Sequence, residues 1–70
     1  MRIAVDPKIC GGKPVIHGTR IMVRNILGML AGGYTFDGIL ASYPELSRVD
    51  VAGTLEYAAR VIDKDQVIAH

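Results

Sequence analysis

The chain has 70 residues, half of them hydrophobic, and a formal net charge of +1. A chain of this length forms one domain at most, and it buries only about 60% of the surface that its unfolded form exposes, so a monomer is marginally stable. The single cysteine, Cys10, excludes an intramolecular disulfide and favours a reducing compartment. No secretory signal precedes the first predicted strand, and the longest apolar stretch, Ile26 to Ala31, is far below the ~20 residues of a membrane span. We therefore expect a cytoplasmic protein.

Charge is unevenly distributed along the chain. Residues 1–24 contain five Lys and Arg residues and one Asp, a net charge of +4. Residues 25–70 contain three Lys and Arg residues and six Asp and Glu residues, a net charge of −3. A polyanion is attracted to a positive surface by Coulomb forces and by the release of counterions. Nucleic acid would therefore approach the N-terminal third first, and the rest of the chain would repel it mildly.

The N-terminal third has the pattern of a small antiparallel sheet. Ile3 to Val5 is a predicted strand. Pro14 to His17 and Arg20 to Val23 flank the dipeptide Gly18-Thr19, and glycine at the first central position is typical of a two-residue type II′ hairpin turn. Because an isolated hairpin is marginal in water, we expect the rest of the chain to cover it.

Two short helices are predicted next. The first begins near Val23 and ends at Gly32-Gly33, since glycine is the usual residue just past a helix end. The second begins after Thr35 as its N-cap and has one apolar face at helical spacing. Pro44 ends it, because proline lacks an amide hydrogen. The apolar face of this second helix consists of Phe36, Ile39, Leu40 and Tyr43.

A third helix is predicted after a short turn. Ser47 is its N-cap, and Asp50 completes an approximate capping box. Its inward face is predicted to contain Val51, Leu55, Ala58 and Ile62. Two helices joined by a short turn describe a helix-turn-helix, a device that places a helix in the DNA major groove.

The predicted fold is therefore mainly α with an N-terminal β-hairpin, in a single domain over residues 1–70. It divides into a hairpin arm (1–23), a three-helix helix-turn-helix core (24–62) and a tail (63–70), in which Gln66 to Ala69 is either a strand or a frayed end.

Several motifs together resemble a known family. The longest is the run from Gly12 to Ile21, Gly-Lys-Pro-Val-Ile-His-Gly-Thr-Arg-Ile. With the later motifs, it resembles domain-of-unknown-function family 433, small bacterial and archaeal proteins with a β-hairpin and a homeodomain-like helix-turn-helix. The resemblance covers about residues 3–60, and the chain departs from it at Thr54, where alanine is more usual, and in its short C-terminus. The later motifs are Ala31-Gly32-Gly33, Ile39-Leu40, Tyr43-Pro44-Glu45-Leu46 and Leu55-Glu56-Tyr57-Ala58.

The resemblance implies a function and partners. Members of the family resemble antitoxins of the VapBC type, often encoded beside a PIN-like toxin nuclease. It therefore implies a homodimer that neutralises a toxin and represses its own operon by binding promoter DNA. Two recognition helices in a dimer lie roughly 34 Å apart, so the operator is expected to be a palindrome. The alternative is a protein-interaction module that neutralises a PIN-like nuclease with little DNA affinity, which the acidic helical part favours.

The candidate nucleic-acid contacts lie on the hairpin and on the outward face of the third helix. On that face Thr54 would touch a thymine methyl or base edge, while Tyr57 and Arg60 would reach phosphates. Gly53 leaves a bare spot for DNA backbone or another helix. The alternative is that this face is simply solvated, because Asp50 and Glu56 offset its positive charge. The full set of candidates is Lys13, Arg20, Arg24, Arg48, Thr54, Tyr57 and Arg60.

Structural roles compete for some of these residues. Arg20 can clamp a phosphate or brace the dimer through a carboxylate such as Asp6, and its place inside a strand favours the structural role. The aromatic residues Tyr34, Phe36 and Tyr43 are expected in the core or a dimer contact, because they are not interleaved with basic residues as base-stacking platforms require.

The sequence predicts neither catalysis nor a cofactor. Two histidines and one cysteine cannot assemble a metal site, and no base or acid can be placed beside Cys10 as a nucleophile. The loop from Cys10 to Pro14 lacks the hydroxyl residue and the following helix of a phosphate-binding loop. We therefore expect no enzyme activity, no cofactor and no metal.

Overall fold

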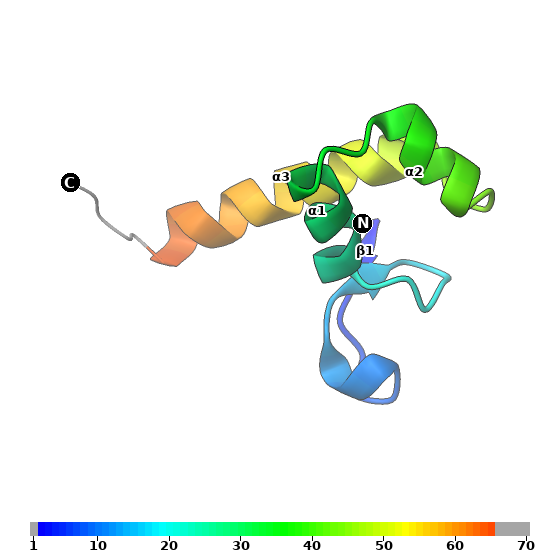
Figure 1. Cartoon of the computed structure of the whole chain (residues 1–70). Helices are drawn as coiled ribbons and strands as arrows, with labels where there is room; N and C mark the ends of the chain where they lie inside the picture. Colours follow the sequence, from blue (N-terminus) through cyan, green and yellow to red (C-terminus); the bar gives the residue numbers. More distant parts are fainter. Residues whose placement is uncertain (1, 66–70) are drawn as a thin grey trace.

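The computed structural model describes residues 2–65, with side chains through Asp63. Figure 1 shows one long helix running across the molecule, with two short helices against its N-terminal half. The N-terminal segment lies below the long helix in this view, and its first strand contacts that helix. The mainly helical fold with an N-terminal pair of antiparallel strands is as predicted. In chain order the elements are β1 (Ile3–Ala4), the 3₁₀ turn η1 (Cys10–Gly12), β2 (Val15–Ile16), α1 (Val23–Ala31), α2 (Phe36–Ser42) and α3 (Arg48–Asp65).

The strands are shorter than predicted and pair differently. β2 lies between β1, where Ile3 pairs with Ile16, and Met22, which forms an isolated bridge with Val15. The predicted two-residue type II′ turn is wrong. The Thr19 N–H donates to the carbonyl of Ile16 (3.0 Å) and Gly18 has φ +82°, so glycine occupies the third position of the turn, as type II requires.

The turn holds itself together through one side chain. The Thr19 hydroxyl donates to the Ile16 carbonyl at 2.8 Å and accepts from the Ile21 N–H at 3.0 Å. The Ile16 N–H in turn donates to the Ile21 carbonyl at 2.9 Å, so four residues separate the paired positions. A threonine at this site thus replaces ladder hydrogen bonds that the short strands do not provide.

α1 ends as predicted, at the glycine pair. Gly33 has φ +99°, and its N–H donates to Leu30 while the Tyr34 N–H donates to Met29. These two bonds form a Schellman motif, which satisfies the free carbonyls of the last turn and needs a residue that tolerates positive φ.

Side-chain caps begin both later helices, again as predicted. The Thr35 hydroxyl accepts from the Gly38 N–H at 3.0 Å. At α3 the Ser47 N–H donates to the Asp50 carboxylate at 2.9 Å and the Asp50 N–H donates back to the Ser47 hydroxyl at 3.4 Å, a reciprocal capping box. The turn that joins α2 to α3 comprises residues 43–47.

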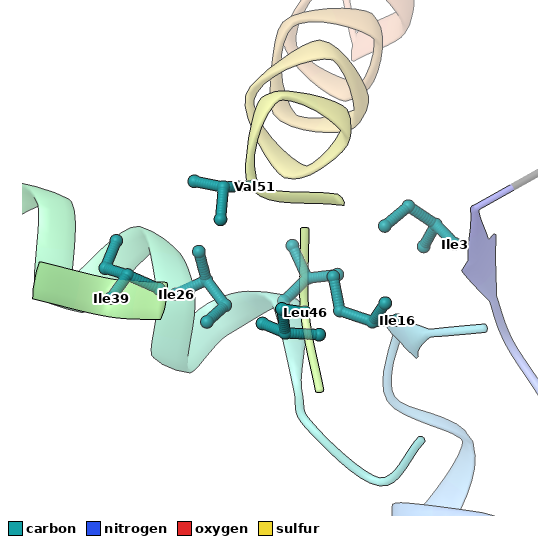
Figure 2. Packing of buried hydrophobic residues seen from close by; sticks show 7 residues of the cluster. Ile3, Ile16, Ile26, Ile39, Leu46 and Val51 are labelled. Carbon is teal, nitrogen blue, oxygen red and sulfur yellow. The ribbon is translucent and has the colours of Figure 1, made fainter. Parts of the chain in front are cut away.

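The core lies where α1, α2 and the start of α3 meet the two strands. Figure 2 shows these apolar side chains pointing toward one another. Ile26, Ile39 and Val51, one from each helix, are completely buried. The whole buried cluster is Ile3, Ile16, Val23, Ile26, Ile39, Leu46 and Val51.

The predicted inward face of α3 is partly wrong. Val51 is buried and Ala58 half-buried, but Leu55 is 43% exposed and Ile62 is 62% exposed. Thr54 is completely buried in their place, and its hydroxyl donates to the Val51 carbonyl at 2.7 Å. Threonine can enter an apolar core at low cost when a helix carbonyl accepts its hydroxyl proton.

The helix extends to Asp65, three residues beyond the predicted end at Ile62. The prediction for Gln66 to Ala69 lies outside the described residues. Within residues 2–65, no helix is both long and apolar enough to cross a membrane.

Candidate nucleic-acid interface

Lys13, Arg24 and Tyr57 come together at one hollow of about 300 Å³. Lys13 follows η1, Arg24 lies in the first turn of α1, and Tyr57 reaches the hollow from α3. Pro14 and Leu27 complete an almost wholly apolar lining. Neither Lys13 nor Arg24 forms an ion pair with any described residue, so both positive charges are available to an anion.

A second groove, of about 480 Å³, runs between the beginning of the chain and α3. Tyr57 lines this groove as well, so it separates the two hollows. Arg2 and Arg60 both line it, together with the exposed residues Val49 and Ala52. Sequence reasoning did not single out Arg2. The available signal was Gly53, since a glycine in a helix interior indicates a close neighbour.

That neighbour is the side chain of Arg2. A Cβ built on Gly53 would lie 3.7 Å from Cβ and from Cδ of Arg2, so the arginine stem crosses the helix at this glycine. The Arg2 guanidinium then donates to the Asp50 carboxylate at 2.9 Å. The prediction that Gly53 is bare for DNA or another helix is therefore wrong, because the chain itself covers it.

Asp50 has a perturbed titration. Its pKa lies below the ordinary value of about 3.8, chiefly because the carboxylate accepts the Ser47 N–H. The Ser47 hydroxyl and the Arg2 guanidinium lower the pKa further, and partial burial opposes them. These contacts stabilise the charged form, so Asp50 is a structural acid that fixes both the start of α3 and the position of Arg2.

Arg48 contacts its own fold. Its guanidinium pairs with Asp37 of α2 and lies 5.6 Å from the centre of the Phe36 ring. Both contacts join the N-terminal turns of α2 and α3. Because more than half of the Arg48 side chain is exposed, the pair is worth little in stability and Arg48 remains accessible.

The candidate contacts Lys13, Arg20 and Arg24 do not all lie together. Arg20 and His17 line a third hollow together with Asp6, away from Lys13 and Arg24. Arg20 forms no ion pair with Asp6 among the described residues; the Asp6 carboxylate instead accepts the Lys8 N–H at 2.9 Å. The predicted brace between the two chains of a dimer stays a prediction, because it would join Arg20 to a carboxylate of the other copy.

Thr54 has to be removed from the candidate contacts. Its side chain is completely buried and its hydroxyl is used inside α3, so it cannot touch a base. Tyr57 is half-buried, whereas Arg60 is exposed. Within residues 2–65 no three His, Cys, Asp or Glu side chains are grouped so that they could hold a metal ion.

Residues 3–58 match the family described as "Protein of unknown function (DUF433)". The chain belongs to this family. The crystal structure of a DUF433 member protein from Anabaena variabilis ATCC 29413 superimposes with a TM-score of 0.81 and 30% sequence identity, over 91% of this chain and 66% of that one.

A curated relative of this DUF433 chain is the "Uncharacterized protein y4eO" of Sinorhizobium fredii (strain NBRC 101917 / NGR234). The two are 34% identical over 44 residues, which are 63% of this chain. The matched part is 20% of the relative, so the chain spans about one fifth of the length of that protein.

Proposed function

We propose that this DUF433 protein is the antitoxin of a toxin–antitoxin pair and that it binds the promoter DNA of its own operon as a homodimer. One observation carries the DNA-binding part: Arg2 and Arg60 line the same groove as the exposed Val49 and Ala52 of α3. Arginines at a groove can bind phosphates, and small apolar side chains can contact thymine methyl groups.

The spacing along α3 supports a contact with a polynucleotide. The Arg2 stem crosses α3 at Gly53, and Arg60 follows seven residues later, about 10 Å further along the helix. Lys13 and Arg24 add a second pair of cations on the other side of Tyr57. Glu56 lies in the same groove as Arg60 and weakens its attraction for phosphate, so we assign the larger share of the salt dependence to Lys13 and Arg24.

Salt titration of DNA binding tests this proposal. A duplex from upstream of the coding sequence, labelled for fluorescence anisotropy, is expected to bind with an affinity that falls steeply as salt rises. The double variant Lys13→Gln/Arg24→Gln should reduce the slope of log affinity against log salt by about 2, one unit for each lost phosphate contact. Lys8→Gln removes an exposed cation outside both hollows and is the matched control. Undetectable binding at low salt, or an unchanged slope in the double variant, would reject the proposal.

A second candidate function is neutralisation of a PIN-like nuclease with little DNA affinity. The apolar hollow of Pro14, Leu27 and Tyr57 favours it, because the unpaired Lys13 and Arg24 beside that hollow suit a partner segment that combines an aliphatic side chain with a carboxylate. Co-purification with the nuclease encoded by the neighbouring gene, and loss of its RNase activity, would support this function. If the nuclease is captured and no duplex binds, the interaction module replaces the DNA-binding regulator.

A further inference from the structure

The apolar hollow of about 300 Å³ that Pro14, Leu27 and Tyr57 line is held in place by the fold. Val23 also lines it and is only 2% exposed, and its N–H donates to the Pro14 carbonyl at 3.0 Å. This bond joins the loop after η1 to the first turn of α1. Leu27 and Tyr57 pack against the buried cluster. The apolar wall is therefore preformed, and its volume is at the lower end of the roughly 300–1,000 Å³ of ligand sites.

The charged side chains at this hollow are both positive. Lys13 and Arg24 are exposed, and neither forms an ion pair with a described residue. The residues that line the hollow include no Asp or Glu. In the other groove that Tyr57 lines, by contrast, Glu56 lies with Arg60. An anion is therefore attracted to the apolar hollow with no carboxylate in its lining to oppose the attraction.

The combination of an apolar wall and two cations selects the chemistry of a ligand. An uncharged aliphatic ligand covers the wall but leaves both cations without a partner. A phosphodiester chain matches the cations but has no aliphatic side chain to place against Pro14 and Leu27. A peptide segment in which carboxylates flank leucine or a similar residue supplies both groups. The Arg24 guanidinium can bind such a carboxylate through two parallel N–H bonds.

We propose that the apolar hollow binds an acidic, leucine-containing segment of a protein partner, and that this segment and DNA exclude each other there. The inference rests on the proposed function, because Lys13 and Arg24 are the cations to which the larger share of the DNA salt dependence is assigned. A cation that holds a carboxylate in the hollow is lost to phosphate. A protein partner bound here therefore releases the promoter instead of strengthening its repression.

Synthetic peptides test the site without knowledge of the partner. The probe is the acetylated and amidated hexapeptide Glu-Asp-Leu-Leu-Asp-Glu, titrated into the isotope-labelled full chain and followed by NMR. The amide signals of Lys13, Arg24 and Leu27 are expected to shift. Two matched peptides separate the contributions: Gln-Asn-Leu-Leu-Asn-Gln removes the charges, and Glu-Asp-Ser-Ser-Asp-Glu removes the apolar side chains. Each should bind about 5-fold or more weakly than the probe.

Substitutions assign the charge preference to the two cations. Lys13→Gln/Arg24→Gln should bind the acidic probe no better than its uncharged counterpart, because no cation remains at the hollow. Lys8→Gln, which removes an exposed cation outside the hollow, is the matched control and should keep the preference. All three replaced side chains are exposed, so the fold is expected to be unchanged, and circular dichroism verifies it.

Competition with DNA tests the exclusion. With the probe at saturation, the slope of log affinity for the upstream duplex against log salt should fall by about 2, as it does in the double variant. The serine peptide at the same concentration should leave the slope unchanged. A duplex that binds with an unchanged slope while the probe occupies the hollow overturns the exclusion.

The remaining outcomes separate this inference from the function on which it rests. Equal binding of the leucine and serine peptides reduces the hollow to a general anion site and overturns the inference. Decanoate that binds as tightly as the probe overturns the peptide as occupant in favour of a free amphiphile. A duplex that binds while the probe does not overturns the peptide site and leaves DNA binding standing. A probe that binds while no duplex does supports the peptide site and rejects both the DNA-binding function and the exclusion.

Discussion

The first half of α3, up to Tyr57, packs against the rest of the protein, whereas the second half, from Ala58 to Asp65, extends beyond it. The first half is fixed by the Ser47–Asp50 capping box, by the ion pair of Asp50 with Arg2, and by the buried Val51 and Thr54. Past Tyr57, none of the described side chains of α3 is among those that pack against the buried cluster. The comparison teaches that one continuous helix can combine a part that packs against the fold with a part whose described side chains are mostly exposed.

The largest expected effect contrasts one apolar residue from each half. Val51→Ala should lower the free energy of unfolding by roughly 2–3 kcal/mol. The Val51 side chain is 0% exposed, so the substitution removes buried methyl groups and leaves a cavity in the core. Ile62→Ala should change it by less than about 0.5 kcal/mol in the monomer. Chemical denaturation at low protein concentration measures both. Equal losses for the two variants would show that the second half packs as firmly as the first.

Removing the cap is expected to have the next largest effect. Asp50→Ala should cost about 1–2 kcal/mol, since it removes the carboxylate that accepts the Ser47 N–H and frees Arg2 from its partner. Hydrogen exchange should show faster opening of the first turns of α3 and little change beyond Tyr57. Asp63→Ala, an acidic substitution in the extension, is the control. A uniform rise in exchange along α3 would contradict the division into halves.

The pH dependence of the cap follows from the lowered pKa of Asp50. Because the carboxylate titrates lower in the folded chain than its ordinary value of about 3.8, it contributes stability above that pH and loses it as the pH falls toward the folded pKa. The stability difference between the wild type and Asp50→Asn should therefore shrink as the pH falls below about 3.8. A difference that stays constant as the pH falls below about 3.8 would exclude the charged form as the source.

Two glycine substitutions should change the stability by smaller amounts and in opposite directions. Gly53→Ala should raise stability by about 0.5–1 kcal/mol, because alanine is the better helix residue and the new Cβ makes an ordinary 3.7 Å contact with Arg2. Gly18→Ala meets no atom within 4 Å, yet φ +82° is strained for alanine, and the chain should lose about 1 kcal/mol. Thermal denaturation of both variants gives the signs. Destabilisation by Gly53→Ala would mean that the added methyl group does not fit between α3 and the Arg2 side chain.

The smallest expected effect is on the affinity for DNA. Thr54→Val keeps the shape of a completely buried side chain and should leave the affinity for the upstream duplex unchanged. Arg60→Gln, in the exposed groove one and a half turns further on, should weaken it about equally for all sequences, as loss of a phosphate contact does. A specific loss of affinity in Thr54→Val would place that residue at the interface after all.

The helices and their ends could be predicted because each depends on a local signal. The glycine pair after α1, the Thr35 cap and the Ser47–Asp50 box act within a few residues of where they lie in the sequence. The register of α3 could not be obtained in this way. Polarity alone places Leu55 inside and Thr54 outside, but the Thr54 hydroxyl is satisfied by the Val51 carbonyl and the projecting helix has nothing to bury Leu55 against.

The candidate site depended still more on tertiary structure. Lys13 and Arg24 meet because the residue after η1 and the first turn of α1 line the same hollow, whereas Arg20 lines a different one. The role of Arg2 depends on a partner 48 positions away, which no local pattern reveals.

That long-range contact also sets when the chain can fold during its synthesis. β1 packs against α3, and Arg2 has no ion-pair partner until Asp50 exists. A ribosome that has made the strands and α1 but not α3 holds β1 without the helix that it packs against, so β1 becomes ordered only after α3 has been made. Slower translation would therefore prolong the exposure of that segment to chaperones and proteases rather than allow a folded intermediate to accumulate.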